Sequence, residues 1–148
     1  MNGSRPKFGV DTSCLVPLLC PWHDLHRATL SAWQRLRQDH TPLVVAAHAL
    51  LECFSVLTRM PPPFRMPPGE VAQALTETLS EGVQTSGLAP ETAWSALYGL
   101  SRRGIAGGRI YDAVIAHSVR QAGATVLLTW NVRDFLLVAP PGLDIREP

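Results

Sequence analysis

The sequence contains very little lysine and little charge of either sign. Lys7 is the single lysine among 148 residues, beside twelve arginines, and charged residues make up 17% of the chain with a net charge of +1. This composition excludes a polybasic protein that holds nucleic acid through its overall charge. Contact with nucleic acid through a local patch stays open.

The sequence also lacks cysteines or histidines at the spacings of a metal site, and it lacks a long apolar run. The three cysteines form no C-x-x-C pair and the five histidines share no metal-ligand spacing, which argues against a disulfide framework and a structural zinc site. The most apolar window, residues 43–57, is shorter than the ~20 residues that a membrane span needs. Residues 1–9 lack the apolar run of a signal peptide. We therefore expect a cytoplasmic protein with no membrane partner.

Short apolar segments alternate with segments of helical periodicity. Strands are expected at residues 7–10, 43–46, 125–129 and 143–146, and helices at 13–20, 24–38, 47–59, 70–80, 90–102 and 109–122. Five prolines in residues 60–69 predict a loop, with a polyproline ligand as the alternative. Because 46% of the residues are hydrophobic, the chain can build a core. The pattern predicts one α/β domain, residues 1–148, around a small, mostly parallel sheet.

Acidic and amide side chains follow the predicted strands. Asp11 stands at the end of the first strand, and Asn131 and Asp134 follow the strand at residues 125–129. Asp112 lies in the first turn of the helix before that strand. Since ligands of open parallel sheets bind outside the carboxyl ends of the strands, these side chains are expected to meet there. Each also has a structural explanation: Asp11 as a helix N-cap, Asp112 in the helix dipole and Asp134 as a turn cap.

Glu52 is an unusual carboxylate because it lies in the middle of a helix within an apolar stretch, residues 46–57. A carboxylate there is costly unless a partner satisfies it. Its structural explanations are a place on the polar edge of the helix or a pair with an arginine such as Arg59 or Arg109.

Four acids at one end of a sheet point to a divalent cation. Clustered carboxylates raise each other's pKa, and a bound cation removes this penalty. Mg²⁺ prefers oxygen ligands, and it can polarise a phosphoryl oxygen and activate water. Thr129 and Asn131 are expected to orient the acids or water molecules. The residues therefore predict metal-dependent hydrolysis of a phosphodiester.

Four motifs in order resemble those of the PIN domain. They are VDTS at residues 10–13, LE at 51–52 followed by VLTR at 56–59, GGRIYDAVIA at 107–116 and LTWNVRDF at 128–135. The resemblance covers residues 7 to about 138, and the single-domain length is similar to that of the VapC-type toxins of bacterial type II toxin–antitoxin systems.

This resemblance implies a three-layer α/β/α fold and a Mg²⁺- or Mn²⁺-dependent endoribonuclease. It also implies a homodimer and a small, VapB-like antitoxin that inhibits it. By position, Asp11, Glu52 and Asp112 would be the main metal-binding and catalytic acids, and Asp134 would complete the site directly or through water. The supporting polar residues would be Thr12, Ser13, Thr129 and Asn131.

Trp130 departs from the family pattern, which has a smaller aliphatic residue there. It could shape the mouth of the pocket, stack on a base or only pack. The arginines near the motifs are candidate contacts to RNA phosphates, each with a solvated face or a salt bridge as the alternative. They are Arg102, Arg103, Arg109 and Arg133.

Other phosphate-handling classes fit less well. Asp11 has no acidic neighbour, as a receiver domain requires, and the residue two places later is Ser13 rather than the aspartate of a haloacid-dehalogenase-type phosphatase. No glycine-rich nucleotide fingerprint follows the first strand. The remaining alternative is a non-catalytic PIN-like module that grips an antitoxin or RNA through its acidic pocket, where a partner's arginine could occupy the metal position.

Overall fold

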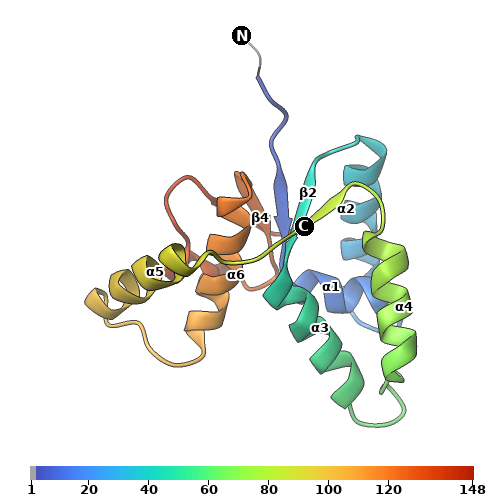
Figure 1. The fold of residues 1–148 in the computed structure, drawn as a ribbon. Coiled ribbons are helices and arrows are strands. Elements are labelled where there is room, and N and C mark those ends of the chain that lie inside the picture. The colour runs from blue at the N-terminus through green and yellow to red at the C-terminus, as the bar shows by residue number, and fades with distance from the viewer. Residues whose placement is uncertain (1–2) are drawn as a thin grey trace.

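The computed structural model describes residues 3–148, and its centre is a parallel β-sheet (Figure 1). The strand order is β3-β2-β1-β4-β5, and every neighbouring pair is parallel. The strands are β1 Phe8–Val10, β2 Leu43–Ala46, β3 Val83–Ser86, β4 Val126–Leu128 and β5 Asp144–Arg146. Because all strands run in one direction, their carboxyl ends share one edge of the sheet.

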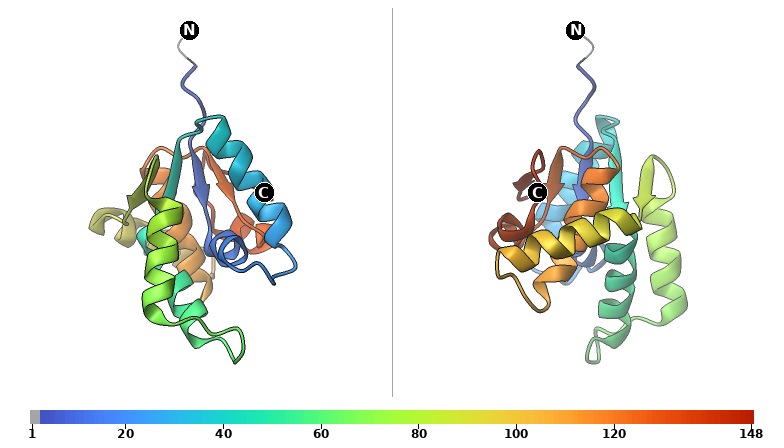
Figure 2. Two further views of the ribbon diagram at one scale, coloured as in Figure 1. Left: turned by 90° about the vertical axis from the view of Figure 1, so that its right-hand side faces the viewer. Right: turned by 60° about the vertical axis from the view of Figure 1, so that its left-hand side comes forward.

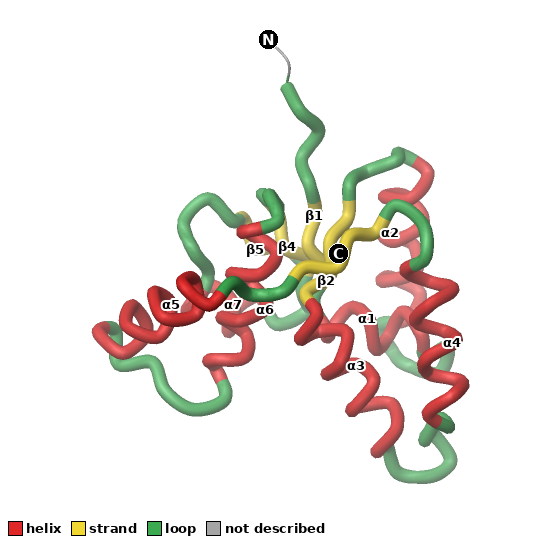
Figure 3. The backbone as a smooth tube through the Cα atoms, in the orientation of Figure 1, coloured by secondary structure: helices red, strands yellow, loops and turns green. Residues whose placement is uncertain are grey.

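Helices cover both faces of this sheet, as Figures 1 and 3 show. Figure 2 gives the two faces in turn, with α1 to α4 on one side and α5 to α7 on the other. The helices are α1 Thr12–Leu19, α2 His26–Gln38, α3 Ala47–Arg59, α4 Pro68–Leu79, α5 Pro90–Arg102, α6 Arg109–Gln121 and α7 Val132–Val138. This arrangement confirms the expected three-layer α/β/α fold.

Two elements were not expected from the sequence, and one boundary was wrong. The expected strands and the other six helices are present with small shifts at their ends, but β3 and α7 were missed. Part of the predicted loop, residues 60–69, is helical because α4 begins at Pro68. Proline fits the first turn of a helix, where its missing N–H leaves no bond unmade.

The single lysine has a structural role at the amino-terminal edge of the sheet. The ammonium group of Lys7, just before β1, donates to the side-chain oxygen of Gln84 on β3 at 3.0 Å and to the carbonyl of Ala122 at 2.8 Å. It thereby ties the edge strand and the end of α6 to the start of β1. Among residues 3–148, no helix has both the length and the apolar character needed to cross a membrane.

Helix α6 packs closely over the central strand because β1 has a glycine at its middle. A Cβ atom built at Gly9 would lie 2.9 Å from Cβ of Val119, which is fully buried. Any larger residue must therefore push α6 away from β1 or distort the strand. Since α6 also carries Asp112, the absence of a side chain at Gly9 sets how near this acid comes to the sheet.

We predict that Gly9→Ala lowers the free energy of unfolding by about 1–3 kcal/mol, because it overpacks a rigid contact. Gly99→Ala is the matched control: its Cβ would meet no atom within 4 Å, and alanine in the middle of α5 should add about 1 kcal/mol. Urea unfolding of both variants measures the difference. Equal stability of Gly9→Ala and the wild type would contradict the close packing.

Candidate active site

Asp11 lies at the carboxyl end of β1, where it caps the N-terminus of α1. It is 2% exposed, and its Oδ2 accepts hydrogen bonds from the backbone N–H of Ser13 at 3.3 Å and the hydroxyl of Thr129 at 2.8 Å. Burial raises the pKa of Asp11, and these hydrogen bonds oppose the rise. The predicted cap is confirmed, and it places a carboxylate at the shared edge of the sheet.

A chain of hydrogen bonds holds this carboxylate in place. Because Thr129 gives its proton to Asp11, the hydroxyl of Ser13 donates to Thr129 across 3.1 Å. The backbone N–H groups of Trp130 and Asn131 donate to Ser13 Oγ at 2.9 Å and to Thr129 Oγ1 at 3.0 Å. The hydroxyls of Ser13 and Thr129 therefore have the predicted supporting place, whereas the side chain of Asn131 is exposed.

Thr12 differs from the other supporting residues. It is 6% exposed, and its hydroxyl is the one buried side-chain polar atom in residues 3–148 that has no hydrogen-bond partner. The hydroxyl of Thr12 therefore has no hydrogen bond to any of the acids, although the residue directly follows Asp11 in the chain.

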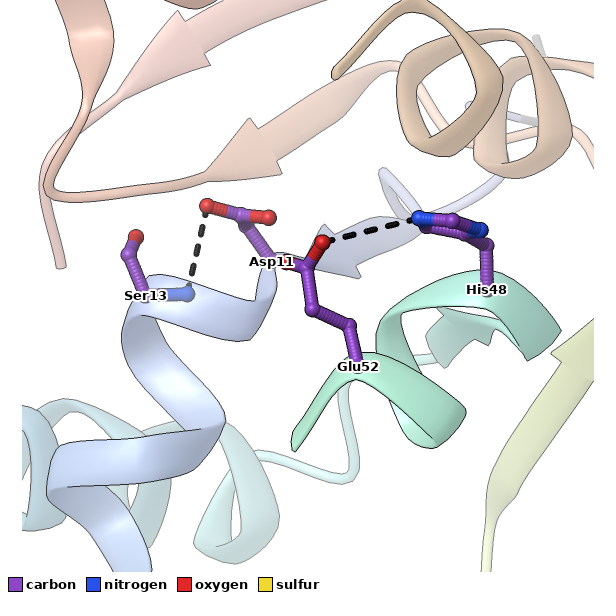
Figure 4. Close-up of polar contacts among 4 residues, drawn as sticks. All are labelled: Asp11, Ser13, His48 and Glu52. Atoms are coloured by element: carbon purple, nitrogen blue, oxygen red, sulfur yellow. Dashed lines mark hydrogen bonds and ion pairs between the residues drawn. The ribbon is translucent and has the colours of Figure 1, made fainter. Parts of the chain in front are cut away.

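Glu52 approaches the site from α3. Figure 4 shows its carboxylate directed toward the region of Asp11, and its Oε2 lies 3.5 Å from Nε2 of His48, one helical turn earlier. Of the two explanations from the sequence, the pair with Arg59 or Arg109 is therefore wrong, whereas the place on the polar edge of the helix is confirmed by a side chain that is 38% exposed. The i, i+4 spacing of His48 and Glu52 was the signal that could have identified the pair.

A tyrosine extends this pair to the neighbouring helix. The ring of Tyr111 on α6 stacks on the imidazole of His48, with 5.3 Å between centroids and 4° between planes. Sequence reasoning missed this contact, because nothing in a linear pattern joins residues on α3 and α6.

Asp112 lies in the first turn of α6, and the charges of the other three acids affect its pKa. Its pKa is raised to about 6, mainly by burial and then by the charges of Asp11, Asp134 and Glu52, while Arg109 opposes the rise. Asp134 lies in the first turn of α7 and is exposed. The structure thus brings the other three predicted acids within electrostatic reach of Asp112.

The acids are suitable ligands for a divalent cation, but their side chains do not converge on one metal position. Within residues 3–148, no three His, Cys, Asp or Glu side chains already surround a common metal position. Three carboxylates nevertheless act on Asp112 against the single cation Arg109, and each nearby carboxylate makes the others harder to ionise. A hard cation with oxygen ligands is the kind of group that fits this donor set.

The remaining predicted residues differ in their surroundings. Arg102 and Arg133 are exposed, while the guanidinium of Arg103 donates to the carbonyl of Leu137. The indole N–H of Trp130 donates to Thr29 Oγ1 at 3.0 Å, and its ring packs against the core. Trp130 is therefore explained by packing.

Comparison with known proteins identifies the family of the chain. The PIN domain family model matches residues 9–139. Ribonuclease VapC27 of Mycobacterium tuberculosis is 35% identical over 112 residues, 76% of each chain. Ribonuclease VapC40 of the same organism is 34% identical over 132 residues, 83% of this chain and 85% of the relative.

Solved structures share the fold. VapBC2 from Rickettsia felis, bound to a DNA fragment from its promoter, aligns with a TM-score of 0.70 at 15% identity, covering 96% of this chain and 98% of that one. The family match and the two relatives establish the class: the chain belongs to the PIN domain family.

We predict that Asp112→Asn stabilises the metal-free protein at neutral pH. The pKa of about 6 in the folded state exceeds the ordinary value of ~3.9, so the folded wild type loses stability as pH rises from ~4 to ~6. Asparagine removes this loss. Thermal unfolding in EDTA should show a higher melting temperature for the variant at pH 7.5 and a shrinking difference towards pH 4.

The control for this prediction is Asp144→Asn, an equivalent change at an exposed aspartate paired with Arg146 on β5. It should not reproduce the gain at neutral pH, because exposed ion pairs contribute little. A melting temperature of Asp112→Asn at or below that of the wild type at pH 7.5 would contradict the raised pKa of Asp112.

Proposed function

We propose that this protein is a metal-dependent endoribonuclease toxin that hydrolyses RNA phosphodiester bonds in the cytoplasm and is neutralised by a cognate antitoxin. The observation that carries the proposal is the convergence of Asp11, Glu52, Asp112 and Asp134 from four different elements at one sheet edge. The names of the relatives, ribonucleases VapC27 and VapC40, support the same reaction.

The four acids would hold Mg²⁺ or Mn²⁺. When bound, such a cation stabilises charge on the phosphoryl oxygens and lowers the pKa of a water molecule. Asp11 would be the fixed ligand, because Thr129 and the N–H of Ser13 restrain its carboxylate. Asp112 would be a second ligand, since a pKa of about 6 in the metal-free protein leaves its carboxyl group mostly ionised at neutral pH. Asp134 is exposed and would complete the site from the side open to solvent.

The arginines near the acids supply positive charge that could attract the phosphates of RNA, which the carboxylates repel. Arg109 lies near enough to Asp112 to lower the pKa of that acid, so it is the candidate for an RNA phosphate beside the cut. Arg102 and Arg133 are exposed and free to reach phosphates further away, whereas Arg103 would first have to release the carbonyl of Leu137.

We predict that RNA cleavage requires both a divalent ion and the acids. Purified protein with a mixture of structured RNAs should produce fragments with Mn²⁺ or Mg²⁺ and none in EDTA. Asp112→Asn and Glu52→Gln should each lower the rate by at least about 100-fold, because each removes charge that holds the ion.

The control is again Asp144→Asn, which removes an exposed carboxylate outside the acid cluster and should cleave at the wild-type rate. Folding of each variant is checked by thermal unfolding. Cleavage by Asp112→Asn at the wild-type rate would remove this acid from the site. A folded wild type that binds RNA or an antitoxin but never cuts with any divalent ion would favour the non-catalytic binding module.

A VapB-like antitoxin and a second copy of the chain are the proposed protein partners. The VapBC2 assembly among the structural neighbours supports the first. For the second, α3 and α4 form an apolar groove of about 400 Å³ with no charged residue in its lining, and Leu51 at its rim is 68% exposed. Such a surface is favourable for a homodimer because water leaves apolar side chains on association.

We predict that the protein runs at about twice its 16.1 kDa chain mass by light scattering, and that Leu51→Glu runs as a monomer. A buried, unpaired carboxylate at an apolar interface costs far more than the interface gains there. Leu136→Glu is the matched control, since Leu136 is 63% exposed on α7 and should leave the mass unchanged. If the Leu51→Glu variant is still a dimer, the groove between α3 and α4 is not the interface.

A further inference from the structure

An exposed aromatic ring borders the acid cluster. Tyr111 directly precedes Asp112 on α6 and is 54% exposed. One side of its ring lies against the His48 imidazole, with the two planes 4° apart, and His48 in turn lies 3.5 Å from Glu52. The stack therefore links the two helices that carry two of the candidate acids, and its position is fixed from both.

The other aromatic pairs of residues 3–148 have different positions. Trp22 is tilted by 36° against Phe64 and by 39° against His23, and Trp94 and Tyr98 are one turn apart on α5. None of these three pairs contains a residue that forms an ion pair with one of the four acids. The stack of His48 and Tyr111 is the one aromatic pair of the described chain that does so.

An uncharged aromatic ring suits RNA at this place. Phosphates near four carboxylates are repelled, but a base has no net charge and gains energy by stacking on an aromatic face. Single-stranded RNA is recognised in this way, with unstacked bases laid on tyrosine or histidine rings. Because the stack on His48 restrains the orientation of the Tyr111 ring, little conformational freedom of this side chain is lost when a base binds.

We propose that Tyr111, supported by His48, is a stacking surface for an unpaired base next to the bond that is cut. The base-binding part of this inference needs only the observed stack, whereas its place beside a cut bond rests on the proposed function. Tyr111 would thereby influence which RNA sequences are cut, since purines stack over a larger area than pyrimidines.

The test compares RNA with and without bases. Binding is measured by fluorescence anisotropy in Mg²⁺, with Asp112→Asn as a background in which cleavage is expected to be lost. The probes are a labelled octamer of adenylate and an octamer of abasic ribose phosphate. Adding Tyr111→Ala should weaken binding of the adenylate octamer by about 5- to 150-fold and leave the abasic octamer unchanged. Tyr111→Phe should bind both as the background does.

Tyr98→Ala is the matched control, because it removes the other tyrosine of the chain, 55% exposed on α5. It should leave both affinities unchanged. Equal losses for the two octamers on Tyr111→Ala would assign the residue a structural role and overturn the proposal. It is also overturned if the background protein binds the adenylate octamer no better than the abasic one, absence of binding included.

The two proposals fail separately. Metal-dependent cleavage by the wild type, without a base-dependent effect at Tyr111, retains the ribonuclease and rejects the stacking surface. A base-dependent effect at Tyr111, in a protein that never cleaves RNA, retains the stacking surface and rejects the ribonuclease.

Discussion

The hydrogen bond between Thr129 and Asp11 is the contact on which the candidate site depends. Its 2.8 Å length joins the end of β4 to the end of β1 and places the acceptor at the N-terminus of α1. The chain between these two residues includes helices of both layers, so this short contact joins residues that are 118 positions apart. Charge-assisted bonds of this kind are stronger than neutral ones, which offsets part of the cost of a buried carboxylate.

The acid cluster would favour binding of a cation, but it lowers the stability of the metal-free fold. Burial raises the pKa of Asp112 to about 6, and the approach of the other carboxylates that would hold a cation adds to the rise. The surrounding structure must sustain this repulsion, and it does so with the tight packing of α6 on Gly9 and the stack of Tyr111 on His48. Sites that are strained or self-repelling in this way are typical of function rather than of stability.

The spacing of apolar residues predicted those helices and strands that bury apolar side chains. The all-buried β2 and β4 and the amphipathic α3 and α6 follow directly from apolar spacing. Strand β3 was missed because its sequence, VQTS, is largely polar: it is an edge strand held by backbone pairing with β2. Helix α7 was missed because seven residues give too little periodicity.

The acids could be predicted for a similar reason, and so could Ser13 and Thr129 beside Asp11, but the contact between α3 and α6 could not. Strand ends and helix starts can be recognised in a sequence, and these positions brought Asp11, Asp112 and Asp134 to one edge. His48 and Glu52 are one turn apart on α3, so their spacing was a signal in the sequence, whereas the stack of His48 on Tyr111 depends on the packing of α3 against α6 and emerged only from the structure. Whether residues 1–148 form one whole domain stays a prediction.

The position of Lys7 has a practical consequence for attaching the molecule to a surface or a dye. Its amine is the only one on a side chain, and it lies before β1, whereas Asp11 follows β1 at the opposite edge of the sheet. Acylation of that amine would remove the hydrogen bonds to Gln84 and Ala122 and loosen the edge strand. Coupling through an added cysteine or a terminal tag would spare these contacts and keep the acid edge facing solution.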